Sequence, residues 1–292
     1  MRGRMIPLSV PRRLVIDLLH FARGIPTVPV QKRMALAPLI EARAACRKRP
    51  RWTAIFTKAY ALMADEFPEF RRAYCKIPWP LLYEYPTSNA SIIVERDYQG
   101  EPSLFSISIK DPAHLPLAEI GRRLQHAAEA PIEEIKDFRR ALNIARLPRL
   151  LRRALWWIAL NQGRQRANYF GTFGVSVYSA LQAESLHPLS PVTTLLNYGV
   201  MSDDGDLDVR IVYDHRVMNG ATVARPLARL EEILNSAVLK EVRALAQRQK
   251  KRSEAVIRDN APGHEPVPND QDKQRADSRA DDPGALIGAV DA

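Results

Sequence analysis

Residues Asp206–Gly220 read D-L-D-V-R-I-V-Y-D-H-R-V-M-N-G, a strand pattern that runs into a histidine and then a turn. Apolar side chains occupy positions 209, 211 and 213, the two-residue period of a strand with one better-buried face. His215 stands at the end of this strand, and Asn219-Gly220 supplies a turn before a helical pattern over about 222–245. A neutral imidazole held there can act as a general base near neutral pH. The pattern therefore predicts a candidate catalytic base between a strand and a helix.

The string Y-D-H-R-V-M-N-G-A at 213–221 resembles a family signature, H-R-V-x-D/N-G. That signature belongs to the catalytic domain of the 2-oxoacid dehydrogenase acyltransferases (E2 components), which share a fold with chloramphenicol acetyltransferase. Two other segments support the resemblance: G-T-F-G-V-S at 171–176 is similar to the family's G-T-F-T-I-S, and I-P-L-S at 6–9 resembles its opening. The turn F-P-E at 67–69 also stands in the matching place. By inspection the resemblance covers roughly residues 6–245.

The resemblance implies an α/β fold, an α+β sandwich of the chloramphenicol acetyltransferase type in which helices cover a mixed β-sheet. A chain of 292 residues accommodates one such domain of more than about 200 residues and a tail. We expect an acyltransferase catalytic-like domain over 1–246, with a basic amphipathic insertion at about 141–168. From about Gln247 the sequence is rich in charged residues, Pro and Gly and poor in apolar ones. This composition predicts a disordered charged tail over 247–292.

Local patterns predict most of the elements of that domain. Apolar spacing and capping signals predict helices over 8–21, 38–46, 53–66 and 117–130. Alternation predicts strands over 28–36, 88–94, 103–109 and 193–200. The strands over 88–94 and 103–109 are joined by D-Y-Q-G, which predicts a hairpin. Its second strand reads L-F-S-I-S-I where the family carries an apolar G-L-V-V-P-V-I, so we expect the channel that it helps to line to differ in shape.

The insertion at 141–168 is the largest departure from the family. It contains A-R-L-P-R-L-L-R-R-A-L-W-W-I-A-L-N-Q-G-R-Q-R, in which leucines and Ile158 follow one helical face and arginines lie elsewhere. Three interpretations stay open. The segment can lie at an anionic membrane surface, where Trp and basic side chains are favoured. It can pack on the sheet or at a subunit contact, or it can line an acyl pocket.

The resemblance implies two catalytic groups. His215 would accept the proton of the coenzyme A thiol, because the thiolate is the competent nucleophile and a free thiol is mostly protonated at neutral pH. The thiolate would then attack an acyl carbonyl. Ser176 would donate its hydroxyl to the oxyanion of the tetrahedral intermediate.

Four further residues are implied in and around this site. The family has an acidic residue where this chain has Asn219, and Arg12 matches the arginine that pairs with it. Asparagine cannot form that ion pair, but its side-chain oxygen can accept a hydrogen bond from guanidinium. Asp214 and Gly220, which flank the histidine motif, are expected to support the site structurally.

Composition limits the partners and the location. The formal charge of +10 favours anionic partners, of which coenzyme A is one, while no basic platform with interleaved aromatic residues indicates nucleic acid. The two cysteines, Cys46 and Cys75, lack the spacing of a disulfide framework or a metal site. We expect no metal and no tightly bound cofactor. The sequence shows neither an apolar run long enough to span a bilayer nor a signal core, so we expect a cytoplasmic protein, with peripheral membrane contact left open.

We therefore expect a coenzyme A-dependent acyltransferase that transfers acyl groups other than amino-acyl groups. The resemblance implies a homotrimer with active sites between subunits. No lipoyl domain with its D-K-A lysine and no peripheral-subunit binding module is recognised, so acyl-coenzyme A, an acyl carrier or a separate lipoyl protein would supply the acyl group. Two alternatives remain. One is a non-catalytic relative acting in assembly or regulation, and the other is a membrane-associated acyltransferase acting on a lipid acceptor.

Overall fold

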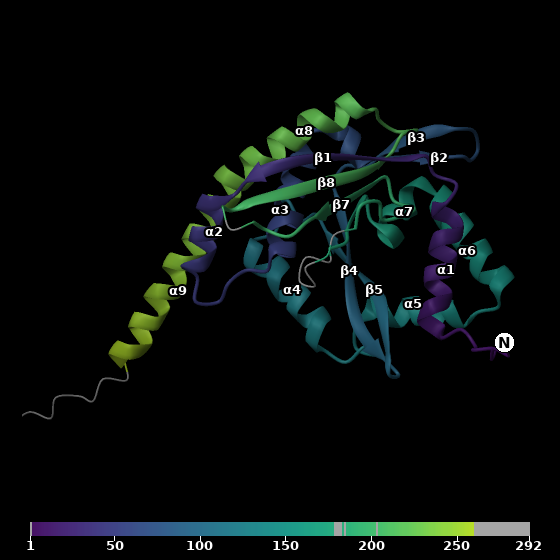
Figure 1. Cartoon of the computed structure of the whole chain (residues 1–292), viewed down its shortest axis with the longest axis horizontal. Helices are drawn as coiled ribbons and strands as arrows, with labels where there is room; N and C mark the ends of the chain where they lie inside the picture. The colour runs from purple at the N-terminus through teal and green to yellow at the C-terminus, as the bar shows by residue number, and fades with distance from the viewer. Residues whose placement is uncertain (1, 178–182, 184, 203, 260–292) are drawn as a thin grey trace, which may run out of the picture. The chain divides into compact units, whose positions relative to one another are not determined.

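The structure is a computed structural model that describes residues 2–177, 183, 185–202 and 204–259 (Figure 1). The chain divides into two compact units, 1–250 and 251–292. The strands that the structure describes all lie in the first unit, and the description of the fold and of the site below concerns that unit.

The described chain alternates helices and strands. The helices are α1 (Val10–Ala22), α2 (Ala37–Ala44), α3 (Trp52–Glu66), α4 (Leu117–Glu129), α5 (Lys136–Arg146), α6 (Arg149–Asn161), α7 (Gly163–Phe170), α8 (Gly220–Ile233) and α9 (Leu239–Asp259). A 3-10 turn, η1 (Pro68–Arg71), and a π-helical turn, η3 (Leu234–Val238), occur between them. The strands are β1 (Thr27–Ala35), β2 (Arg72–Cys75), β3 (Leu81–Glu84), β4 (Asn89–Tyr98), β5 (Glu101–Lys110), β6 (Phe173–Val175), β7 (Thr194–Tyr198) and β8 (Asp206–Asp214). The predicted helices and strands outside the insertion and the region after 222 are found within a few residues of their expected bounds.

Six of the described strands form one mixed sheet in the order β1-β8-β7-β6-β4-β5. The predicted strand 206–214 is β8, which pairs antiparallel with both β1 and β7. β6 runs parallel to both β4 and β7, and β4 and β5 form the predicted hairpin. The strands β2 and β3 form a separate ribbon. This mixed sheet with helices confirms the predicted α/β class.

Helices cover the two faces of the sheet unequally. One face is covered by α3, α4 and α8, and the side chains that it buries include Ile92, Ile107, Phe173 and Ile211. On the other face, α1 and α5 contact β5, α7 contacts β4 and β5, and α6 joins them through α7 (Figure 1). The second helix layer therefore lies over the β4–β5 end of the sheet and not over β8.

The insertion folds as helices and not as one continuous amphipathic segment. The break between α5 and α6 falls at Leu147-Pro148, because proline has no amide hydrogen and is tolerated at the start of a helix but not in its middle. α6 packs on α1 through a buried ion pair, in which the guanidinium of Arg152 donates to the carboxylate of Asp17. On the opposite side of α6, Leu150 and Trp157 are exposed. The packed-helix interpretation thus describes one face of α6, and contact with a membrane stays a prediction for the other.

The region after 222 differs from the prediction in two ways. A single helix over about 222–245 was expected, whereas η3 separates α8 from α9. α9 continues to Asp259, so residues 247–259, which the sequence assigns to the tail, are helical. Residues 260–292 lie outside the described residues, and disorder there stays a prediction. In the part of the chain that the structure describes, no helix has the length and apolar character needed to cross a membrane.

Candidate active site

β8 delivers His215 to the end of the sheet. Its register with β1 sets Asp214 opposite Thr27, and the next backbone amide, that of His215, donates to the carbonyl of Pro26 at 2.9 Å. The imidazole lies 5.7 Å from the ring of Tyr213, centroid to centroid, and is exposed. It forms no hydrogen bond with any described residue. Both ring nitrogens are therefore free to exchange a proton with a substrate.

The Asp214 side chain forms no hydrogen bond with the imidazole of His215. It stabilises the turn that carries this histidine. The buried Asp214 carboxylate accepts hydrogen bonds from the guanidinium of Arg216 at 2.7 and 2.9 Å and from the Arg216 amide at 3.0 Å. The same guanidinium lies over the ring of Tyr74, 4.4 Å from its centroid. A charge-assisted, two-point pair of this kind restrains the backbone on both sides of His215. Asp214 thus supports the site through Arg216.

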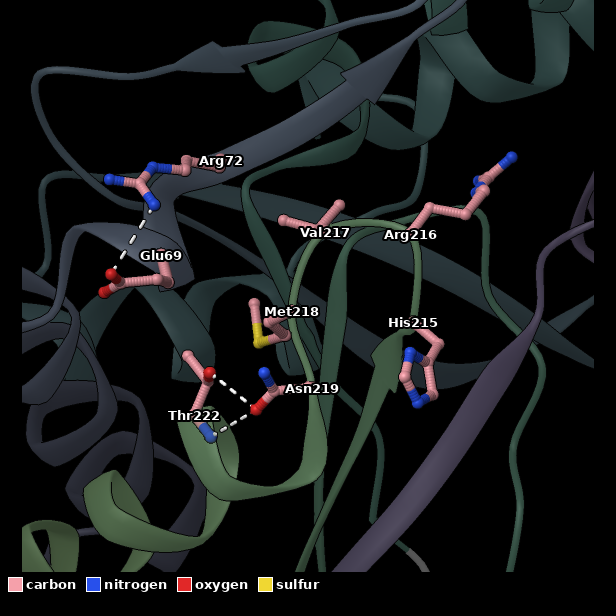
Figure 2. A pocket seen from close by; sticks show the side chains of 8 residues that line it. All are labelled: Glu69, Arg72, His215, Arg216, Val217, Met218, Asn219 and Thr222. Atoms are coloured by element: carbon pink, nitrogen blue, oxygen red, sulfur yellow. Dashed lines mark hydrogen bonds and ion pairs between the residues drawn. The ribbon is translucent and has the colours of Figure 1, made fainter.

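Asn219 caps the helix that follows the turn. Its Oδ1 accepts a hydrogen bond from the amide of Thr222 at 3.0 Å and from the Thr222 hydroxyl at 2.9 Å (Figure 2). These bonds satisfy an amide at the start of α8 that has no partner within the helix. Gly220 is the first residue of α8, and a Cβ there would meet the Tyr213 hydroxyl at 3.7 Å, an ordinary contact. The structure therefore gives Asn219 a capping role and shows no steric need for glycine at 220.

Replacing Asn219 with alanine should destabilise the protein, since loss of an N-cap costs about 0.5–2 kcal/mol. We expect the Tm to fall by about 2–4 °C for each kcal/mol lost. The Asn219→Asp variant should keep the Tm of the wild type, because aspartate caps helices as well as asparagine does. Thermal denaturation followed by circular dichroism measures both variants, and equal Tm losses would contradict the capping role.

The structure does not bring Arg12 to the site. The sequence pairs it with Asn219, but its guanidinium lies 3.5 Å from the Glu101 carboxylate, and Asn219 bonds to Thr222 instead. The reason is topological: α1 packs against α5 and β5, whereas β8 lies near the opposite edge of the sheet. Within one chain, Arg12 has no contact with the turn that carries His215.

A pocket of about 470 Å³ surrounds the histidine turn (Figure 2). Its lining residues are Glu69, Arg72, His215, Arg216, Val217, Met218, Asn219 and Thr222. Glu69 comes from the predicted F-P-E turn and lies 3.5 Å from Arg72, which also pairs with Glu84 at 2.8 Å. Sequence reasoning did not identify Arg72, because nothing in its local pattern distinguishes it from other surface arginines. The pocket is polar and charged, and both of its arginines are paired with carboxylates.

A second histidine lies near the same strand end. His187 Nε2 and the hydroxyl of Thr27 are 2.8 Å apart, within hydrogen-bonding distance, and Thr27 is the register partner of Asp214. No sequence signal indicates its position, because a long-range contact brings it to β1.

Ser176 occupies a different cavity of the same chain. Its backbone is held by a hydrogen bond from its amide to the Leu196 carbonyl at 3.1 Å and by one from the Asn197 side chain to its carbonyl at 2.7 Å. Its hydroxyl forms no hydrogen bond with a described residue. It lines a cavity of about 670 Å³ beside the helices of the insertion. Ser176 and His215 are therefore both available for chemistry, but they face separate spaces in a single chain.

No protein-family model matches the sequence, and no curated protein matches it. Solved structures match the fold. The dihydrolipoamide acetyltransferase of Azotobacter vinelandii matches with a TM-score of 0.61 at 17% identity, over 82% of this chain and 94% of that chain. A probable dihydrolipoamide acetyltransferase from Listeria monocytogenes matches with a TM-score of 0.59 at 17% identity, over 82% and 95%. A truncated catalytic core of the 2-oxoacid dehydrogenase multienzyme complex from Thermoplasma acidophilum matches with a TM-score of 0.58 at 16% identity, over 80% of this chain and 99% of that chain. The predicted fold is confirmed.

Proposed function

We propose that this chain, which has the fold of dihydrolipoamide acetyltransferase catalytic cores, is a coenzyme A-dependent acyltransferase with His215 as its general base. The observation that carries the proposal is an exposed imidazole without a hydrogen-bond partner in the described chain, held at a strand end by the buried Asp214–Arg216 pair. The A. vinelandii structure was determined to investigate the role of a serine, a histidine and an asparagine in that enzyme's catalytic mechanism. That asparagine follows the histidine by four positions, as Asn219 follows His215 here.

In the proposed reaction, His215 takes the proton of an acceptor thiol or hydroxyl. The resulting nucleophile forms a bond to the acyl carbon of a thioester, and the carbonyl oxygen becomes an oxyanion. The intermediate collapses when the carbon–sulfur bond of the donor breaks. The imidazolium then returns the proton to the leaving sulfur, so that acid and base roles fall to one residue.

Ser176 is the proposed oxyanion donor, and it acts from a neighbouring subunit. Within one chain His215 and Ser176 line different cavities, so both reach one acyl group only if a second copy completes the site. A homotrimer with head-to-tail contacts supplies three equivalent sites of this kind. Ser176 has the property that the role requires, a hydroxyl without a hydrogen-bond partner in the described chain and facing a cavity.

Mixed oligomers test this sharing of the site directly. We expect His215→Ala and Ser176→Ala to be inactive alone but to regain activity when they are unfolded, mixed and refolded together. In a random mixture, about a quarter of the sites between subunits combine an intact histidine with an intact serine. Recovery near that fraction of the wild-type rate supports a site between subunits. If each site belonged to a single chain, mixing would restore nothing.

The Ser176→Ala variant should lose about 10²–10³-fold in kcat, the usual effect of removing one oxyanion donor. The KM should change little, because the hydrogen bond forms only as charge develops on the oxygen. The matched control is Ser236→Ala, since Ser236 is exposed and its hydroxyl donates only to the carbonyl of Glu232. Steady-state kinetics on both variants checks the prediction, and similar kcat values for the two would remove Ser176 from the mechanism.

The activity itself is tested by incubating the protein with a panel of acyl-coenzyme A thioesters and an acceptor, and by following free coenzyme A with a thiol reagent. The protein's own thiols should contribute little signal, because Cys46 and Cys75 are both buried and burial raises their pKa values. Release that requires His215 supports the transferase. A folded protein that turns over no thioester contradicts it and favours the non-catalytic alternative.

A further inference from the structure

A large apolar cavity separates the insertion from the sheet. Its volume is about 670 Å³, within the range of about 300–1,000 Å³ typical of small-molecule sites. Apolar side chains from α1, β4, β5 and α6 dominate its wall: Leu14, Val15, Leu18, Leu19, Ile93, Leu104, Leu155, Trp156, Ile158 and Ala159. The two helices that supply most of these residues lie over one end of the sheet (Figure 1).

The sheet forms the floor of the cavity and contributes several small residues to it, among them Ser91, Ser106, Ser108 and Gly174. On β5, Leu104, Phe105, Ser106 and Ser108 line the cavity, while Ile107 and Ile109 are buried in the core on the other face. Ser106 is paired with Ser91 of β4, hydroxyl to hydroxyl, at 2.6 Å. The small serine side chains leave space on this face of the sheet.

The helices α1 and α6, which cover the cavity on the side away from the sheet, are held together by specific contacts. Arg152 of α6 is buried against Asp17 of α1 and also donates to the carbonyl of Leu147 at 3.1 Å. Phe21 of α1 and Trp156 of α6 stack with their rings 5.9 Å apart. Buried ion pairs and ring stacking fix the spacing of two helices, so the cavity between them and the sheet is a built feature of the fold.

Two serines of the lining have hydroxyls without partners in the described chain. Ser176 lines the cavity with a hydroxyl that bonds to no described residue. Ser108 also lines it, and its hydroxyl is buried without a hydrogen-bond partner among the described residues. The charged groups in the lining are engaged: the Asp137 carboxylate accepts from the Ser108 amide at 2.8 Å, and the Arg140 guanidinium lies over the Tyr169 ring at 4.0 Å. Such a wall suits a long apolar group with one polar end.

We propose that this cavity holds the chain of a medium- or long-chain fatty acyl thioester, with the acyl carbonyl at Ser176. The inference rests on the proposed function and deepens it by naming the acyl group. The acyl chain extends directly from the carbon that the Ser176 hydroxyl faces, whereas the phosphates of coenzyme A stay outside, because burying unpaired charges in an apolar wall is costly. The donor's carbon–sulfur bond breaks as the bond to the acceptor forms, and His215 carries the proton between the two.

A chain-length series tests the assignment. Purified full-length protein is assayed with acetyl-, butyryl-, octanoyl- and palmitoyl-coenzyme A. We expect kcat/KM to rise about fourfold for each of the first added methylenes, the factor that corresponds to burial of one methylene group. A rate that does not depend on chain length, or that falls beyond acetyl, overturns the inference while the transferase activity itself stands.

Filling the cavity provides a second arm. Ala159→Trp places a large ring in the lining of α6, and its matched control is Ala154→Trp on the same helix, where the alanine is exposed and does not line the cavity. We expect the ratio of kcat/KM for palmitoyl- to acetyl-coenzyme A to fall at least about tenfold in Ala159→Trp and to stay at the wild-type value in the control. Ser106→Leu, which fills the floor, provides a second variant if Ala159→Trp does not fold. An unchanged ratio in every folded filling variant contradicts the inference.

Binding separates this inference from the proposed function. A fluorescent polyene fatty acid should bind the wild type and His215→Ala alike, since His215 does not line the cavity, and palmitoyl-coenzyme A should displace it from both. Binding without turnover of any thioester would uphold the apolar pocket and reject the transferase. Turnover of acetyl-coenzyme A with no binding of the fatty acid would uphold the transferase and reject the apolar pocket.

Discussion

We expect replacement of His215 with alanine to lower kcat/KM for acyl thioesters by about 10²–10⁴-fold, the usual contribution of a general base. The loss arises because the acceptor must then give up its proton to water. The fold should survive, because the imidazole is exposed and forms no hydrogen bond with a described residue, while the turn is held by the Asp214–Arg216 pair and the His215 amide. Steady-state kinetics with free coenzyme A as the readout, together with the Tm of the variant, measures both expectations.

The matched control for this variant is His126→Ala. His126 is an exposed histidine of α4. Its removal should leave kcat/KM within about twofold of the wild type, as for a surface residue outside any site. Equal losses in the two variants, or a His215→Ala protein with wild-type activity, would remove His215 from the mechanism and leave the fold without an identified base.

Replacing Asp17 with alanine destabilises the protein strongly. Asp17 is fully buried and Arg152 nearly so, and the carboxylate also accepts from Arg153 at 3.4 Å. Removal of one partner of a buried pair leaves an uncompensated charge, which costs about 3–5 kcal/mol. For a domain of this size that loss corresponds to a Tm lower by roughly 6–20 °C. Urea unfolding and thermal denaturation measure the loss.

Two further variants show whether charge is the cause. Glu101→Ala removes an exposed carboxylate paired with Arg12, where the side chains are 37% and 52% exposed, and should cost no more than about 1 kcal/mol. The double variant Asp17→Leu, Arg152→Met replaces the pair by apolar side chains and should recover much of the stability lost in Asp17→Ala. If the double variant is less stable than Asp17→Ala, hydrogen bonds of Arg152 to the backbone matter more than the pairing of its charge.

Several elements could be predicted from the sequence because their determinants are local. Alternation of apolar residues predicts β8, the D-Y-Q-G turn predicts the β4–β5 hairpin, and Ser9 caps α1 where the sequence places a helix start. The motif around His215 also predicts an available imidazole at a strand end. Each of these properties depends on neighbouring residues in the chain, so a single sequence is enough to identify it.

Contacts between distant segments could not be predicted in this way. The sequence pairs Arg12 with Asn219, but the order of the strands puts α1 at the β5 edge, where Arg12 meets Glu101. The Asp17–Arg152 pair and the contact of His187 with Thr27 have no local signal at all. For the insertion, the sequence left an acyl pocket as one of three open interpretations.

The sequence by itself determined the position of the histidine at the end of β8 and the turn before the helix that follows, because periodicity and turn chemistry act over a few residues. Its resemblance to a known family implied the mixed α/β fold. Only the tertiary structure decided that His215 and Ser176 face different cavities and that the insertion encloses an apolar space over the serines of β5. Those features depend on how helices separated by more than a hundred residues pack together, and packing of that kind is set by the shape and charge of both partners at once.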